Sequence, residues 1–169
     1  MLGNVYWDAR DVVLAALCVV SVYTDVTTGK IKNWLTFPVM AAGLALAPLA
    51  APHWWDGAAG LGCAFAVGVL FWRVLPALKP GDVKMLMAAG SLLGPQAAIR
   101  ATLLSAILFF PVGIAVLVAR GRVRNFFRVA RNYIRAPGTQ DPDTTVIIHA
   151  PVIAAGIVLA RLQSWPELW

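Results

Sequence analysis

Apolar residues gather in six long stretches along the chain, and charged residues fall mostly between them. Short segments rich in Gly, Pro and Thr separate the stretches, and such segments form turns or end helices. Most of the stretches have the length of a helix rather than of a strand. The pattern predicts an all-α protein whose helices cover about residues 8–25, 34–50, 57–78, 83–94, 97–119 and 145–162.

Composition indicates the surroundings of these helices. The 169-residue chain is 60% hydrophobic and 13% charged, whereas a soluble domain has roughly 45–50% apolar and about 25% charged residues. Long runs without charge are typical of helices that face lipid. We therefore expect an all-α membrane protein with about six transmembrane helices, forming one domain over residues 1–169. Asp8 and Asp11 lie just before the first apolar run, where a cleavable signal peptide would be basic, so the first helix is expected to remain in the mature protein.

The Lys and Arg residues predict an orientation, because cytoplasmic loops of membrane proteins carry an excess of positive charge. Eleven of the 14 basic residues fall beside the loops after the first, third and fifth helices, which places these loops in the cytoplasm and both termini outside. Topology thus explains the net charge of +6 better than nucleic-acid binding does. The loop of residues 120–144 alternates arginines with apolar residues. It fits either an amphipathic helix on anionic lipid or a solvated topology signal.

Two of the eight acidic residues differ from the rest in their position. Asp25 ends the first predicted helix, and Asp82 precedes the fourth. Taken singly, Asp25 fits a turn residue that pairs with Lys30, and Asp82 fits an ordinary N-cap. Asp11 and Asp56 lie near the outer ends of helices and are expected to be solvated.

The short fourth helix changes this interpretation. About a dozen residues span only ~18 Å, against a membrane core of ~30 Å, so this helix begins or ends inside the membrane. An ionisable residue at that depth is a functional candidate. The orientation puts Asp25 and Asp82 at the cytoplasmic ends of their helices. Two carboxylates that face one cavity share a proton, and one can activate water while the other protonates a scissile carbonyl.

At these positions the chain resembles the prepilin peptidases. Residues 25–33, Asp-Val-Thr-Thr-Gly-Lys-Ile-Lys-Asn, are similar to that family's first aspartate motif. Residues 79–84, Lys-Pro-Gly-Asp-Val-Lys, are similar to its Gly-x-Gly-Asp-x-Lys motif. The resemblance implies a GxGD-type membrane aspartic protease that removes the leader of type IV or Flp-type prepilins at the cytoplasmic face of the inner membrane. It implies Asp25 and Asp82 as the catalytic pair, with supporting or substrate-loop roles for Gly81, Lys84, Asn33, Lys30 and Lys79.

Two positions depart from the family pattern: Lys79 replaces the first Gly of the second motif, and Lys32 stands where Pro is common. A side chain at position 79 restricts the loop, which leaves open an altered substrate choice or a degenerate site. The chain also lacks the cysteine-bearing cytoplasmic insert of the larger, methylating family members. The resemblance therefore implies a short form with peptidase activity alone, acting on prepilin or pseudopilin substrates.

The remaining residues suggest no cofactor and no metal. Cys18 and Cys63 each lie alone in an apolar run, which is typical of packing residues. His53 is expected at the membrane surface and His149 away from the site. Two other functions stay open, a non-catalytic scaffold of a pilus or secretion machine and a small proton-coupled transporter. The oligomeric state, the individual substrate and the aspartate that holds the shared proton are not predicted.

Overall fold

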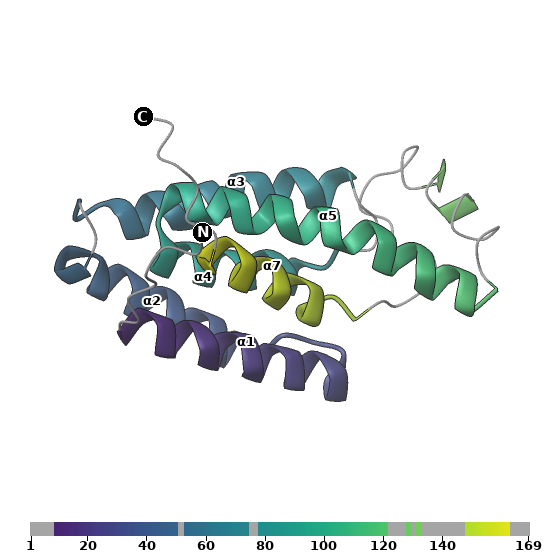
Figure 1. Ribbon diagram of the computed structural model, residues 1–169, viewed down its shortest axis with the longest axis horizontal. Helices are drawn as coiled ribbons and strands as arrows, with labels where there is room; N and C mark the ends of the chain where they lie inside the picture. The colour runs from purple at the N-terminus through teal and green to yellow at the C-terminus, as the bar shows by residue number, and fades with distance from the viewer. Residues whose placement is uncertain are drawn as a thin grey trace.

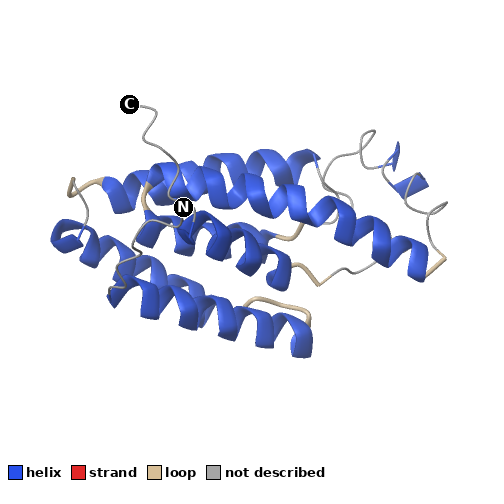
Figure 2. Ribbon diagram, viewed as in Figure 1, coloured by secondary structure: helices blue, strands red, loops and turns tan. Residues whose placement is uncertain are grey.

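The computed structural model describes residues 9–50, 53–74, 78–121, 128–129, 131–132 and 148–162, and they form a bundle of helices (Figure 1). The helices are α1 (Ala9–Thr28), α2 (Asn33–Ala50), α3 (Asp56–Val74), α4 (Pro80–Leu93), α5 (Pro95–Ala119) and α7 (Ala150–Leu162). Figure 2 shows no strand in this part of the chain. The all-α prediction is confirmed, and the helix ends differ from the predicted ones by up to five residues.

Two described helices are long and apolar enough to cross a membrane. They are α1, with 20 residues and a mean hydropathy of 1.5, and α5, with 25 residues and a mean hydropathy of 2.5. α7 is a shorter apolar helix of 13 residues. Length and hydropathy therefore support two of the six predicted transmembrane helices. The short fourth helix is as predicted, since α4 has 14 residues.

α4 is the central helix of the bundle. It contacts each of the other five described helices, and in Figure 1 it lies between α3 and α5 on one side and α1 and α2 on the other. Its buried residues lie all around the helix rather than on one stripe, as expected for a core helix. They are Asp82, Val83, Met85, Leu86, Ala88, Ala89, Gly90, Ser91 and Leu92.

A close glycine contact brings α3 against α4. A Cβ added to Gly90 would lie 2.5 Å from the carbonyl oxygen of Gly60, and a Cβ on Gly60 would meet the carbonyl of Gly90 in turn. The absence of both side chains lets the two backbones approach. The sequence Gly90-Ser-Leu-Leu-Gly94 therefore serves packing within the chain. Gly94, at a φ of +82°, ends α4 and lets the chain turn into α5.

α1 packs through one face. Its buried residues recur every three or four positions, which matches the helical period of 3.6. They are Asp11, Leu14, Leu17, Cys18, Ser21, Thr24 and Asp25. The two aspartates at the ends of this series therefore lie on the same inward face, four turns apart. The segment of residues 120–144, for which the sequence left open an amphipathic helix or a solvated topology signal, lies outside the described residues apart from 120–121, 128–129 and 131–132.

Candidate active site

Asp25 joins the first and last described helices. Its side chain is on the inner face of α1 and only 2% exposed. Its Oδ2 accepts the backbone N–H groups of His149 and Ala150, each at 3.0 Å. The first N–H groups of a helix have no partner within the helix, and they carry the positive end of its dipole. Asp25 therefore caps the N-terminus of α7 from another helix.

The alternative interpretation of Asp25 as a turn residue that pairs with Lys30 is not supported, since the Lys30 side chain is exposed to solvent while Asp25 is buried. Asp25 also does not end its helix. α1 continues for one more turn to Thr28, and Gly29 then stops it at a φ of +65°. The N–H of Gly29 donates to the carbonyl of Asp25 at 2.9 Å, which is a common helix ending.

Asp82 belongs to the first turn of α4 and is 1% exposed. The N-cap of the helix is Lys79, so Asp82 is its third residue and not the N-cap that the sequence suggested. The N–H of Lys79 donates to Asp82 Oδ2 at 2.8 Å, and the N–H of Asp82 donates to the carbonyl of Lys79 at 3.0 Å. This reciprocal pair, together with Pro80 at the first helical position, starts the helix earlier than predicted.

His149 brings the two aspartates to one place. While its backbone N–H bonds to Asp25, its imidazole Nδ1 lies 3.7 Å from Asp82 Oδ2. The side chains of His149 and Asp82 are 1% and 2% exposed, respectively. The imidazole also stacks on Phe109 of α5, with ring centroids 4.6 Å apart and ring planes 17° apart. Asp25 and Asp82, the aspartate pair, thus each contact the same buried residue, Asp25 through its backbone and Asp82 through its side chain.

The expectation that His149 lies away from the site was wrong. The sequence did contain a signal, because this histidine opens the last apolar stretch at the same predicted side of the membrane as both aspartates. Its proximity to them still depends on contacts between residues that are 124 apart along the chain.

Two lysines connect the start of α4 to the turn between α1 and α2. Lys79 Nζ donates to the carbonyl of Gly29 at 3.2 Å, and Lys84 Nζ donates to Asn33 Oδ1 at 3.0 Å. The ammonium of Lys84 also lies 5.4 Å from the centre of the Phe37 ring, within cation–π range. Both aspartate-bearing segments are therefore linked by polar contacts beside the site.

The second motif needs no left-handed backbone. Lys79 has a φ of −105° and a ψ of 156°, which any residue adopts. A Cβ on Gly81 would lie 3.5 Å from the Cβ of Ile31, an ordinary contact distance. The lysine in place of glycine therefore introduces no strain, and its side chain makes the bond to Gly29.

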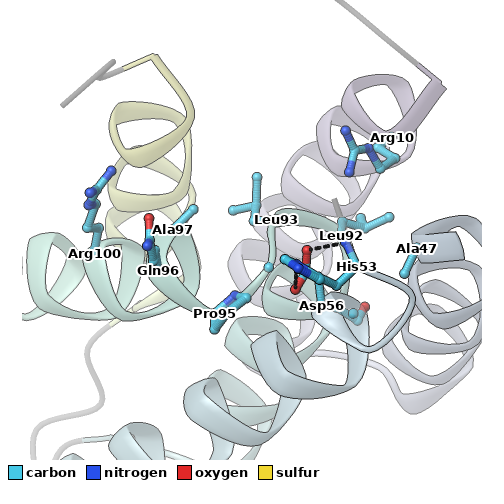
Figure 3. Close-up of a pocket in the computed structure, with 13 residues that line it drawn as sticks. Arg10, Ala47, His53, Asp56, Leu92, Leu93, Pro95, Gln96, Ala97 and Arg100 are labelled. Carbon is cyan, nitrogen blue, oxygen red and sulfur yellow. Dashed lines mark hydrogen bonds and ion pairs between the residues drawn. The ribbon is translucent and has the colours of Figure 1, made fainter. Parts of the chain in front are cut away.

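The larger cavities lie at the opposite end of α4 from Asp82. One cavity of about 450 Å³ lies where α3 and α5 begin, and Figure 3 shows Arg10 on one side, Gln96 and Arg100 on another, and His53 with Asp56 between them. Neither member of the aspartate pair lines it. A second cavity, of about 260 Å³, shares Arg10 and Arg100. A small cavity of about 20 Å³ with mostly apolar walls, which include Phe109, lies beside His149.

The sequence had suggested that the acidic residues at this opposite end are solvated. In the structure, both of them make contacts within the protein. Asp11 is 6% exposed and binds Arg161 of α7 through two bonds, 2.6 and 2.9 Å long. Asp56 accepts the backbone N–H of His53 at 3.1 Å. Among the described residues, no cluster of three or more His, Cys, Asp or Glu side chains is arranged to hold a metal ion.

Comparison with known proteins adds one finding. The model of the type IV leader peptidase family matches residues 12–114, a segment that includes both members of the aspartate pair. This segment covers more than half of the 169 residues and ends before His149. Comparisons with curated proteins and with solved structures gave no match.

Proposed function

Because this chain belongs to the type IV leader peptidase family, we propose that it is an aspartic endopeptidase that removes the leader from type IV or Flp-type prepilins or pseudopilins. The observation that carries the proposal is the burial of Asp25 and Asp82 around His149. These are the aspartates of the two motifs, and they come from helices that lie far apart in the sequence. Aspartates are seldom fully buried unless they are paired, and a buried cluster of titratable groups is a candidate for a functional site.

The proposed reaction uses the aspartate pair with one shared proton. The ionised carboxylate removes a proton from water, which attacks the scissile carbonyl carbon. The protonated carboxyl gives its proton to the carbonyl oxygen, so charge does not accumulate on the tetrahedral intermediate. The carboxyl that took the proton from water then gives it to the peptide nitrogen as the C–N bond breaks. A hydroxyl group of the intermediate returns its proton to the other carboxylate as the product carboxyl forms, which restores the single shared proton of the pair. This hydrolysis needs no metal, since the proton transfers use the two carboxyl groups.

We propose that substrate enters beside the aspartate pair, at the surface that carries Lys30, Lys79, Lys84 and Asn33. Lys30 is exposed, and Lys79, Lys84 and Asn33 connect the surrounding segments. We assign Lys79, Lys84 and Asn33 to the support of the catalytic segments and Lys30 to the substrate loop. Gly81 packs beside Ile31 in the same region.

The proposed location is the inner membrane, with the aspartate pair at the cytoplasmic face and both termini outside. α1 and α5 have the length and hydropathy of membrane spans, and α2, α3, α4 and α7 would complete a six-helix bundle. Large apolar side chains on the outside of the bundle support contact with lipid tails. Among them are Val12, Val19, Leu70, Ile107 and Phe110.

Leader removal tests the proposal directly. The chain is produced together with a candidate prepilin, and leader loss is measured by intact mass for the wild type, Asp25→Asn and Asp82→Asn. We expect complete processing by the wild type and at least a ~10³-fold slower rate in either variant, because each carboxyl has its own proton-transfer role. Asp56 lies at the start of α3, far from the aspartate pair, so Asp56→Asn is the matched control and should process normally.

Processing that continues unchanged in both variants would refute the assigned pair. If folded wild-type protein failed to process several prepilins, the non-catalytic scaffold would become the better description. Uptake into vesicles driven by a proton gradient would favour the transporter.

A further inference from the structure

The backbone of His149 is fixed independently of its side chain. Its N–H bonds to Asp25 Oδ2, and its carbonyl accepts the N–H groups of Val152 and Ile153, each at 3.0 Å. These bonds set the position of the α-carbon between α1 and the first turn of α7. The imidazole then extends toward Asp82 and lies along Phe109, and it is almost fully enclosed. A side-chain substitution at position 149 can therefore leave the backbone bonds in place.

Among the residues that the structure describes, the charged groups close to the imidazole come from two helices. α1 contributes Asp25 and α4 contributes Asp82, with Lys79 beside it at the N-cap, while α5 contributes the uncharged ring of Phe109. Lys79 is only half-buried, and its ammonium bonds to the carbonyl of Gly29. Of the described groups in this cluster, the two carboxyls and the imidazole are the titratable ones that are fully buried.

The net charge of the buried carboxyl pair indicates a role for His149. A pair of carboxyls with one shared proton has a charge of −1, and a buried net charge is costly unless an opposite charge lies nearby. The separation of 3.7 Å between His149 Nδ1 and Asp82 Oδ2 is within ion-pair range and longer than a hydrogen bond. An imidazolium at that distance would make the cluster neutral.

We propose that His149 is a positioning residue of the aspartate pair, whose imidazolium balances the charge of the pair through Asp82 and holds that carboxyl in place. The proton on Nδ1 stays on the imidazole during the reaction, and the water and the scissile bond exchange protons with the two carboxyls alone. The inference rests on the proposed function for its kinetic test but not for its spectroscopic test.

The kinetic test follows leader cleavage against pH in the wild type, His149→Phe and His149→Gln. Phe keeps the stack on Phe109 but has no nitrogen, and Gln keeps a polar group but has no charge. Without the cation, ionisation of either carboxyl is less favourable, so the acid limb of kcat/KM should move to higher pH by about one unit. We expect kcat near pH 6 to fall about tenfold, with the larger loss in His149→Phe.

A role in packing alone would lower activity or expression without moving the acid limb. An acid limb at the wild-type pH in both variants would therefore overturn the inference, even while Asp25→Asn and Asp82→Asn still abolish cleavage. His53→Phe is the matched control, since His53 is the other histidine of the chain, and its profile should equal that of the wild type.

The second test needs no substrate. With ¹⁵N-labelled histidine in detergent-solubilised protein, the ring signals of both histidines report their protonation against pH. His53 is an internal reference. Its Nδ1 also lies near a carboxylate oxygen, 3.8 Å from Asp56 Oδ1, but its side chain is 60% exposed, whereas His149 is buried. We expect Asp82→Asn to lower the pH at which half of the His149 rings are protonated, and to leave His53 unchanged. Identical His149 titrations in the wild type and Asp82→Asn would overturn the inference, whether or not the protein cleaves prepilins.

Discussion

At the scale of single residues, the sequence could identify the aspartates but not their common neighbour. Asp25 and Asp82 are conspicuous because ionisable groups are scarce in an apolar chain and because each lies in a recognisable motif. His149 carries no such motif. The contact that makes it relevant is set by how α7 packs on α1 and α4, and a single sequence contains no direct record of such packing. The partner of Asp11 was missed for the same reason, since Arg161 is 150 residues away.

Lys79 gives a prediction at this scale. Lys79→Gly removes the bond from Nζ to the carbonyl of Gly29 and frees the backbone in the unfolded chain. The free energy of unfolding should fall by about 1–2 kcal/mol, and prepilin cleavage should slow about threefold to tenfold. Thermal unfolding in detergent and the rate of leader loss measure the two effects.

Lys79→Ala is the control for Lys79→Gly, because it removes the same bond without the added backbone freedom. It should lie between the wild type and Lys79→Gly in stability. Faster cleavage by Lys79→Gly than by the wild type would contradict the prediction and would mean that the lysine hinders the site.

At the scale of elements, hydrophobic periodicity predicted the helices well and their ends less well. α4 starts at Pro80 because Lys79 and Asp82 cap each other, an interaction that depends on backbone geometry. α7 begins at Ala150 rather than at the predicted residue 145, and the side chain of Asp25 in α1 caps its N-terminus there. Helix ends that depend on distant residues cannot be predicted from local pattern.

The contact between α3 and α4 gives a prediction with a matched pair of glycines. In Gly60→Ala the added methyl group would clash with the carbonyl of Gly90, so the helices must move apart. We expect the free energy of unfolding to fall by about 1–3 kcal/mol. Gly62 lies two residues away in the same helix and has open space around it, so Gly62→Ala should be neutral or stabilising by up to ~1 kcal/mol. Equal effects in thermal unfolding would contradict the close approach.

At the scale of the whole molecule, α1 and α7 are fastened at both ends by aspartates of α1. Asp25 holds the N-terminus of α7, and Asp11 holds Arg161 near its C-terminus. Both aspartates lie on one face of α1, so a single helix face fixes both the position and the direction of α7. The bundle thus has a polar attachment at each end and an apolar core between them.

The attachment at the Asp11 end should matter for stability more than for chemistry. Asp11→Asn leaves the half-buried guanidinium of Arg161 without its carboxylate, and we expect the free energy of unfolding to fall by about 1–3 kcal/mol. Cleavage by the folded variant should stay within about threefold of the wild type, because the aspartate pair is at the other end of α1. A double-mutant cycle with Arg161→Gln measures the coupling of the two residues. A coupling energy near zero would contradict the prediction.

The cap that α7 receives from Asp25 also bears on how the protein is made. The backbone donors for Asp25 belong to residues 149 and 150, so they leave the ribosome long after α1 has been synthesised. Until they arrive, the chain contains both aspartates of its motifs, but the carboxylate of Asp25 lacks the two N–H donors that hold it. A nascent chain interrupted before residue 148 would therefore be inactive although its family motifs are complete. Translation itself would delay proteolysis until the last described helix has been inserted.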